Sequence, residues 1–492
     1  MSGSEVNDLQ NAPRAKHGRR LSTLALLLPL SACYQPQSLD ARSVLADVEN
    51  EQRAFRIARA SVPTPVTGGA TVAADPGQGM TEDEAVALAL KLNPDLRAAR
   101  RRIGIAEGQV VAAGALKNPT VDFDWLHLEE ISKYRSYAVT LGWEPPQPGV
   151  RSERKAAAVS QVDAAKQDLA EAEWQTAMNV RAAHTNLRAA VEDRALIESA
   201  LATRKRITEL VQKRMTGGAS TRIDLIVAQL AISDTEYDRD TLAARELEAG
   251  RLLGQLIGTT EPIRAAGAVV EEPRSPPAFE KLIDAAMVTR PALVAEQARF
   301  EQNEHTLAME HALAWPWFKF TAMPRYRLDP SQDLPNGFSA GISLTVPLLD
   351  QNQGPIRVAE GTRDQEREVF RKVAASIHLE IQTALDKIAF QRKTLDRYRA
   401  VVLPDLGTHE KLLATAAAGG QLDVVAVLRA EDAILKARRE YVALRLAHRQ
   451  AWMDLERAVG LRIAGEGPEA PASPAPSSPP PAATTPAAPA GP

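Results

Sequence analysis

The sequence is short of cysteine, aromatic side chains and long apolar runs, and each shortage excludes a class of protein. One cysteine among 492 residues excludes an intrachain disulfide framework. Aromatic residues make up only 4% of the chain, fewer than expected for a conventional globular enzyme. Beyond the N-terminal region no segment has the roughly 18 consecutive apolar residues of a membrane-spanning helix. A net charge of −3 gives no indication of nucleic-acid binding, and the abundant alanine favours long helices.

The only cysteine, Cys33, follows a basic segment at 14–20 and a short apolar segment at 21–30. This order is typical of a secretory signal and is too short for a stable membrane-spanning helix. The residues Leu30-Ser31-Ala32-Cys33 resemble a bacterial lipobox, which implies removal of residues 1–32 and acylation of Cys33. Several acyl chains would then anchor the mature chain, since one alone binds a membrane only marginally. An ordinary secretory signal with an incidental cysteine is the alternative.

Two parts of the sequence resemble each other at an offset of roughly 200 residues, the pattern of an internal repeat. The aligned pairs are, in chain order, Pro94 with Pro291, Pro119 with Pro316, and LIG (256–258) with AVG (458–460). Because the pairs keep their order, they predict a tandem duplication. Its parts are expected at 1–32 (signal peptide), 33–80 (acylated N-terminal linker), 81–262 (first repeat), 263–279 (inter-repeat linker), 280–462 (second repeat) and 463–492 (disordered Pro/Ala-rich tail).

Each repeat is expected to run helix, strand, strand, long helix, turn, helix. In the first repeat Thr81 and Glu84 form a capping-box pattern, which begins a helix that ends near Lys117. A helix of about 65 residues should follow at 151–215, and a third at 221–257. At about 1.5 Å per residue the long helix measures roughly 100 Å, as much as the two shorter helices placed end to end.

Apolar and small residues in two of these helices follow the alternating three- and four-residue spacing of a coiled-coil seam, which permits close helix packing. In the second repeat the seam comprises Val427, Ala430, Ile434, Ala437, Tyr441, Leu444, His448, Ala451, Leu455 and Ala458. In the long helix it comprises Val180, Ala183, Leu187, Ala190, Ile197 and Leu201, and Arg194 interrupts it.

Short segments at 120–126, 136–144 and 338–346 alternate apolar and polar side chains with the period of two of a β-strand. One apolar and one polar face over about nine or ten residues is typical of a transmembrane β-barrel strand. A half-buried strand in a soluble sandwich is the alternative. Two hairpins supply too few strands, because closed barrels have at least about eight and open edges are not tolerated in lipid. An obligate assembly is therefore expected, and three copies would supply twelve strands.

The ordered plan and several segments resemble the TolC family of outer-membrane efflux proteins, which are often lipoproteins. The segments are NPDLRAAR (93–100), KNPTVDFD (117–124), SLTVPLLDQNQGPIRVAE (343–360), AGGQLDVVAVLRAEDAIL (418–435) and ERAVG (456–460). Those at 112–119, 149–158 and 348–356 look more like the heavy-metal, CzcC-like branch. The resemblance implies a mainly α fold with a small membrane β part. A long-helix α-barrel would be continuous with a β-barrel completed by trimerisation, with two tandem repeats and four strands per protomer.

The resemblance also implies a function: the outer-membrane exit duct of a tripartite efflux system, exporting small solutes such as heavy-metal cations, and not an enzyme. The implied partners are two further copies of the chain, a periplasmic adaptor protein, a proton-driven inner-membrane pump and outer-membrane lipid, without nucleic acid. The implied location is the bacterial outer membrane with a large periplasmic part. No cofactor is implied beyond the covalent lipid on Cys33.

In the family, the two helix turns form the periplasmic tip, where the tunnel narrows and the adaptor docks. The corresponding residues here are Gly217, Gly218, Arg222, Ile223 and Asp224 in the first turn and Gly419, Gly420, Leu422, Asp423 and Arg429 in the second. Asp224 and Asp423 begin helices, so each is expected to cap its helix. The alternative is that they pair with the two arginines across neighbouring hairpins and hold the tip closed.

Asp122, Asp124 and Glu144 are expected to face the barrel lumen, where three copies would make acidic rings that favour cations. Ordinary solvated lining is the alternative. The eight histidines form no His-x-x-x-His or Glu-x-x-His motif, and no glycine-rich phosphate loop is present. We therefore expect no catalytic residues and no resident metal site.

Two functions of different classes stay open. The first is the duct; the second is a lipid-anchored periplasmic coiled-coil scaffold without a pore, which would not need paired amphipathic strands. Within the first, metal efflux, multidrug efflux and type I secretion share one kind of duct, because substrate choice belongs largely to the pump.

Overall fold

The computed structural model describes residues 40–61, 63–65, 71–73, 79–128, 134–266, 275–327, 337–408 and 423–463. The sequence predictions for Cys33, the signal peptide, Gly419, Gly420, Leu422 and residues 464–492 lie outside this part. The chain divides into two units, residues 1–54 and 55–492. Helix α1 (Ala41–Ser61) begins in the first unit, and the second contains both repeats and a small antiparallel pair, β1 (Pro63–Pro65) with β2 (Thr71–Ala73).

The two repeats have the same order of elements. The first contains α2 (Glu82–Leu92), α3 (Pro94–Gly114), β3 (Thr120–Leu128), β4 (Tyr134–Trp143), α4 (Val150–Thr216) and α5 (Arg222–Ile257). The second contains α6 (Phe279–Thr289), α7 (Pro291–Leu313), β5 (Trp317–Arg327), β6 (Gly337–Thr345), α8 (Gln353–Arg397), the π-helical turn η1 (Tyr398–Val402), helical residues 403–408 and α10 (Val424–Val459). Among the helices that the structure describes, none is long and apolar enough to cross a membrane.

The expectation of one continuous helix from Thr81 to Lys117 is wrong. The capping box at Thr81 is present, but α2 ends at Leu92 and α3 begins at Pro94 and ends at Gly114. Proline has no amide hydrogen and is favoured at the first position of a helix, so Pro94 ends one helix and begins the next. The Asn93 side chain stabilises the break by accepting hydrogen bonds from the Asp95 and Leu96 amides at 2.8 and 3.2 Å.

The same break occurs in the second repeat, where α7 begins at Pro291. In each repeat a glycine with positive φ ends the last helix and packs against the break: Gly258 at φ 96° and Gly460 at φ 84°. A Cβ at Gly258 would lie 2.9 Å from the Leu92 carbonyl oxygen, and one at Gly460 would lie 3.2 Å from the Arg290 Cα. The paired prolines and glycines of the sequence therefore build one junction twice.

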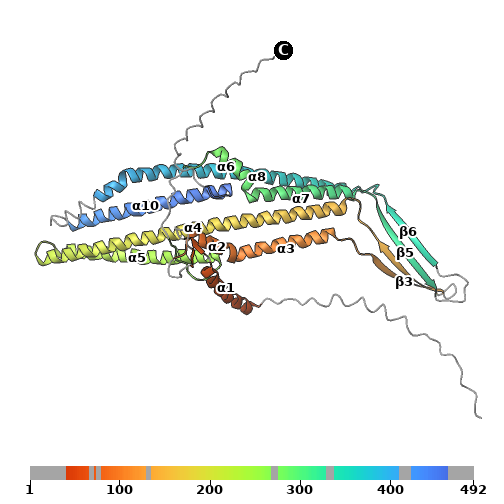
Figure 1. Cartoon of the computed structure of the whole chain (residues 1–492), viewed down its shortest axis with the longest axis horizontal. Helices are drawn as coiled ribbons and strands as arrows, with labels where there is room; N and C mark the ends of the chain where they lie inside the picture. The colour runs from red at the N-terminus through yellow and green to blue at the C-terminus, as the bar shows by residue number, and fades with distance from the viewer. Residues whose placement is uncertain are drawn as a thin grey trace, which may run out of the picture. The chain divides into compact units, whose positions relative to one another are not determined.

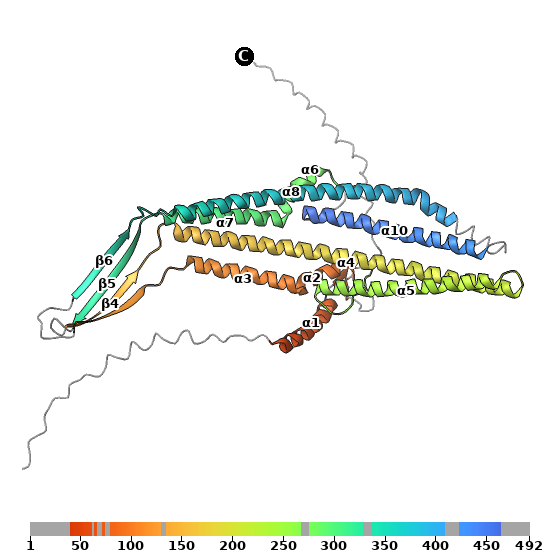
Figure 2. The same ribbon diagram turned by 180° about the vertical axis from the view of Figure 1, so that it is seen from behind.

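The long helix of each repeat packs along two shorter ones (Figures 1 and 2). Helix α4 contacts α3 and α5, and α8 contacts α7 and α10. Helix α4 also packs against α7 and α10, which joins the repeats. Each repeat has its own apolar core beside its junction, and equivalent residues are fully buried in the two cores: Leu253 and Ile257 in the first, Leu455 and Val459 in the second.

The predicted coiled-coil seams face the interior of the helical unit. Along α10, Val427, Ile434, His448 and Leu455 are buried, and along α4 the buried seam residues include Leu187 and Ile197. Arg194, which interrupts the α4 seam, pairs with Glu246 of α5 at 3.1 Å. The interruption is thus a charged contact between the two helices of the first hairpin.

The four strands form one antiparallel sheet in the order β3-β4-β5-β6, so the hairpin of one repeat pairs with that of the other. The register puts the apolar residues of all four strands on one face, in rows such as Trp125, Tyr137 and Tyr326. The Tyr137 and Tyr326 rings stack with centroids 5.3 Å apart. Phe123 is 74% and Trp125 68% exposed, so this apolar face is uncovered in the protomer.

Candidate functional site

The turn between α4 and α5 lies at the end of the helices remote from the sheet (Figures 1 and 2). Gly217 caps α4, and Gly218 has a φ of 76°, a backbone conformation that favours glycine. The Ala219 amide donates a 2.8 Å hydrogen bond to the Arg214 carbonyl oxygen, which closes the turn. The glycine pair therefore ends the long helix where the sequence predicts.

Both predicted tip aspartates cap helices in the protomer. The Asp224 carboxylate accepts a 2.8 Å hydrogen bond from the Thr221 amide, and the Thr221 hydroxyl accepts one from the Asp224 amide. The Asp423 carboxylate accepts a 3.0 Å hydrogen bond from the Val425 amide at the start of α10. The capping prediction is thus confirmed for both residues, whereas ionic links to Arg222 and Arg429 across neighbouring hairpins stay a prediction.

Below the turn a small apolar cluster joins the first hairpin to α10. Its buried members are Val211, Ala228, Val424 and Leu428. On the outer side of α5, Ile223 is 70% exposed, and Leu230 and Tyr237 follow it at seven-residue steps, also exposed. Residues seven apart lie on one face of a helix, so these three form an uncovered stripe, of which the sequence analysis singled out only Ile223.

A buried arginine above this cluster links three helices. Arg204 of α4 donates hydrogen bonds to the Thr235 hydroxyl of α5 at 2.6 Å and to the Ala231 carbonyl oxygen at 3.1 Å, and it pairs with Asp432 of α10. The sequence analysis missed it. It continues the three- and four-residue spacing of the α4 seam beyond Ile197 and Leu201, so a charged residue at a seam position was the available indication.

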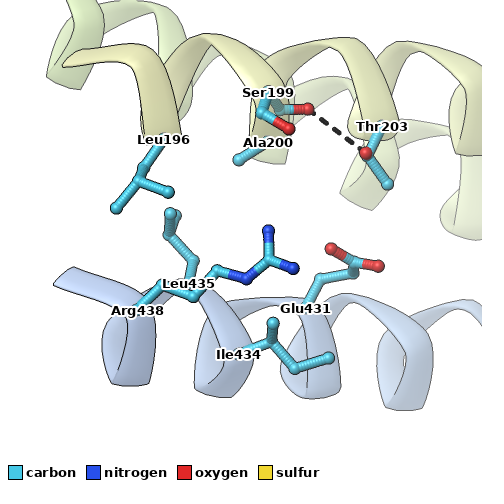
Figure 3. A pocket seen from close by; sticks show the side chains of 8 residues that line it. All are labelled: Leu196, Ser199, Ala200, Thr203, Glu431, Ile434, Leu435 and Arg438. Atoms are coloured by element: carbon cyan, nitrogen blue, oxygen red, sulfur yellow. Dashed lines mark hydrogen bonds between the residues drawn. The ribbon is translucent and has the colours of Figure 1, made fainter. Parts of the chain in front are cut away.

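A second charged contact joins α4 to α10 farther from the turn. Arg439 binds both oxygens of Asp193 at 2.6 and 2.8 Å, and Arg445 pairs with Glu192. Between the two contacts lies a cavity of about 260 Å³, lined from α4 by Leu196, Ser199, Ala200 and Thr203 and from α10 by Glu431, Ile434, Leu435 and Arg438 (Figure 3). The boundary between the hairpins is therefore polar and incompletely filled over this length.

A pair of carboxylates meets between α7 and α8. Burial, and then the neighbouring Glu296 carboxyl, raises the pKa of Glu366 to about 7, while Arg299 acts in the opposite direction. Arg299 also binds both oxygens of Asp168 on α4, at 2.6 and 2.7 Å. The two glutamates therefore share a proton near neutral pH.

The predicted lumenal carboxylates lie at the sheet. Asp122 and Asp124 are on the polar face of β3, and the Thr140 hydroxyl donates a 3.4 Å hydrogen bond to Asp124. Glu144 directly follows β4, with the Lys117 ammonium 3.5 Å away. Lys319 and Arg325 of β5, which the sequence analysis did not consider, lie on the same face.

Ligand chemistry is sparse in the part of the chain that the structure describes. No group of three or more His, Cys, Asp or Glu side chains there is arranged to hold a metal ion. His305 pairs with Glu153 at 2.8 Å, and His448 is buried at its seam position. The described histidines of this pattern hold helices together.

Residues 85–259 match the outer membrane efflux protein family. The chain is 20% identical over 383 residues to the cobalt-zinc-cadmium resistance protein CzcC of Cupriavidus metallidurans, a match that spans 77% of this chain and 90% of that protein. Among solved structures, a membrane protein from Pseudomonas aeruginosa has a TM-score of 0.66 at 19% identity, with 82% of this chain and 97% of that one covered. CusC, described in terms of transmembrane channel formation, has a TM-score of 0.64 at 17% identity, with 82% and 98% covered. Family and fold are thus those of channel proteins.

Proposed function

We propose that this chain, a member of the TolC-like outer membrane efflux proteins, is the outer-membrane exit duct of a tripartite efflux system. It conducts small solutes from the periplasm or from a pump to the exterior. Catalysis has no part in this function.

The observation that supports the duct best is the four-stranded sheet with one uncovered apolar face and one polar face. Its outer strands, β3 and β6, each have a partner on only one side in the protomer. Unpaired backbone groups are too costly in lipid, so the sheet must be continued by further strands. Three copies joined edge to edge close a twelve-stranded barrel, with the apolar face toward lipid and the polar face toward a water-filled lumen.

The cargo we propose is a heavy-metal cation. The similarity to a protein named for cobalt, zinc and cadmium resistance supports this choice over multidrug efflux or type I secretion. A duct does not need to bind its cargo tightly, since tight binding slows release. The absence of a three-ligand site from the described residues is compatible with such a role.

The remaining parts of the proposal concern anchoring and assembly. Acylation of Cys33 attaches each protomer to the outer membrane beside the barrel. The helical tip contacts a periplasmic adaptor protein, which links the duct to a proton-driven inner-membrane pump. The exposed stripe of Ile223, Leu230 and Tyr237 offers an apolar surface for such helix packing.

Single-channel conductance in planar bilayers tests the duct. Purified wild-type protein is compared with the double variant Asp224→Ala with Asp423→Ala, which removes both tip carboxylates. A small wild-type conductance that increases in the variant supports a duct held closed at its tip. An unchanged conductance keeps the duct and limits both aspartates to capping. Well-folded trimers without conductance in either form would support the scaffold.

A further inference from the structure

The polar face of the sheet has cations as well as carboxylates. Asp122 and Asp124 lie on β3 and Glu144 directly follows β4, whereas Lys319 and Arg325 lie on β5. Residues directly opposite each other on neighbouring strands share a face, so the register arranges these charges in rows that cross the sheet. The rows differ in their balance of charge.

The row nearest the hairpin loops is balanced. Asp124 pairs with Ala138 on β4, and Ala138 pairs with Arg325 on β5. One carboxylate and one guanidinium therefore lie on either side of a small residue, and Gly337 on β6 completes the row.

The carboxylate nearest the helices is also balanced. Glu144 lies 3.5 Å from the Lys117 ammonium. Lys319 follows the Trp143–Phe320 pair and lies on the same face, and its Cε lies 3.7 Å from the Cβ position of Gly142. Two ammonium groups thus face this end of the sheet.

The row of Asp122 has no cation. Asp122 pairs with Thr140, and Met323 and Ser339 pair on the next two strands in the same register. The adjacent row toward the helices consists of Thr120, Gly142, Thr321 and Gly341, all uncharged. Among the described rows of the polar face, Asp122 is thus the carboxylate without a cation in its own row.

We propose that Asp122 sets the charge selectivity of the duct within the membrane, with Arg325 and Lys319 offsetting the other two carboxylates. This inference rests on the proposed function, because it needs the polar face to line a lumen and three copies to form a ring of Asp122. The class of cargo it favours is small hydrated cations.

The effect has to act through solvent. Fixed charges are felt over about 10 Å at roughly 0.1 M salt, a distance comparable with the spacing of two or three rows. A carboxylate and a cation in one row therefore largely cancel for a passing ion. A ring of three uncompensated carboxylates raises the local cation concentration and lowers that of anions.

The permeability ratio of K⁺ to Cl⁻, taken from the reversal potential of single channels under a KCl gradient, tests this assignment. Wild-type channels should prefer K⁺, and Asp122→Asn should lower the ratio about threefold at roughly 0.1 M salt. Thr140→Arg, which adds a cation opposite Asp122, should lower it as much without removing the carboxylate. It serves as the second variant where Asp122→Asn fails to fold.

The matched control removes a balanced pair. Asp124→Asn combined with Arg325→Gln should leave the ratio unchanged, while Arg325→Gln alone should raise it. Conducting Asp122→Asn channels with the wild-type ratio would overturn the assignment, as would a double variant that lowers the ratio to the same extent. Folded wild-type trimers that do not conduct would instead overturn the proposed function, and this inference with it.

Discussion

The two junctions of the helical unit differ from the boundary between α4 and α10. At the junctions, each proline break packs against a positive-φ glycine, and equivalent leucines and β-branched residues are fully buried. Along the boundary, the contacts near the turn are a four-residue buried cluster and several ion pairs around a polar cavity of about 260 Å³.

The difference indicates where the helices can separate. Apolar cores are close-packed and lose contacts outright when they open. Charged contacts at a half-exposed boundary exchange partners with water at low cost, so they contribute little net stability while they still specify one arrangement. We expect the junctions to hold the helices together and the α4–α10 boundary to be the part that moves.

The largest effect is expected in the junction cores. Leu253→Ala and Leu455→Ala remove equivalent buried side chains, so each should lower the free energy of unfolding by about 2–5 kcal/mol. Leu252→Ala, on the exposed side of α5, should cost less than about 0.5 kcal/mol. Denaturant unfolding in detergent measures all three. Unequal effects of the two core variants, by more than their spread, would show that the junctions are not equivalent.

A smaller effect is expected at the three-helix contact of Arg204. Asp432→Asn leaves a buried guanidinium without its carboxylate, and should cost about 1–2 kcal/mol. Arg204→Met removes the buried charge itself and leaves an exposed carboxylate, so it should cost less. The same unfolding measurement gives the order of the two variants.

Channel recordings add a functional check on that contact. If the boundary moves, both Arg204→Met and Asp432→Asn should increase single-channel conductance, whereas Leu253→Ala should not. Equal conductance in all four proteins would contradict a mobile boundary.

The smallest effect concerns the glutamate pair on the sheet side of the junctions. The pKa of Glu366 is raised from 4.5 to about 7, so the folded chain holds a proton that the unfolded chain releases earlier. Stability should therefore fall as pH rises from about 4.5 to 7 and level off above that range. Besides Glu296, the charges close to Glu366 are Arg299 on α7, and they stay charged over this range.

Melting temperature as a function of pH measures this effect. Glu366→Gln should reduce the fall between pH 4.5 and 7, and Glu368→Gln, one exposed position along α8, should leave it as in the wild type. A wild-type melting temperature that rises steadily over this range would contradict a shared proton.

Local sequence patterns predicted most elements of the fold. The period of two in 120–126 and 136–144 predicted β3 and β4, and the seam spacing predicted the buried side of α10. The glycine pair predicted the end of α4 within one residue. The break at Pro94 was missed because a capping box and helix-favouring residues on both sides outweighed a proline that stands at the first turn of a new helix.

The candidate site divides in the same way. Asp224 and Asp423 were correctly predicted as caps, because capping depends on residues within one turn. Arg204 and Asp432 are 228 residues apart, and no local pattern connects them. The balance of charge on the sheet also needed the register between the hairpins of the two repeats.

The sequence by itself determined the order of the elements, the duplication, the two faces of each strand and the ends of the helices, since these depend on neighbours a few residues away. Tertiary structure decided which helices share a boundary, which charges meet there, and which carboxylate on the sheet has no cation in its row. Those contacts join segments of different repeats, and their energies depend on a distance and burial that only the packed chain provides.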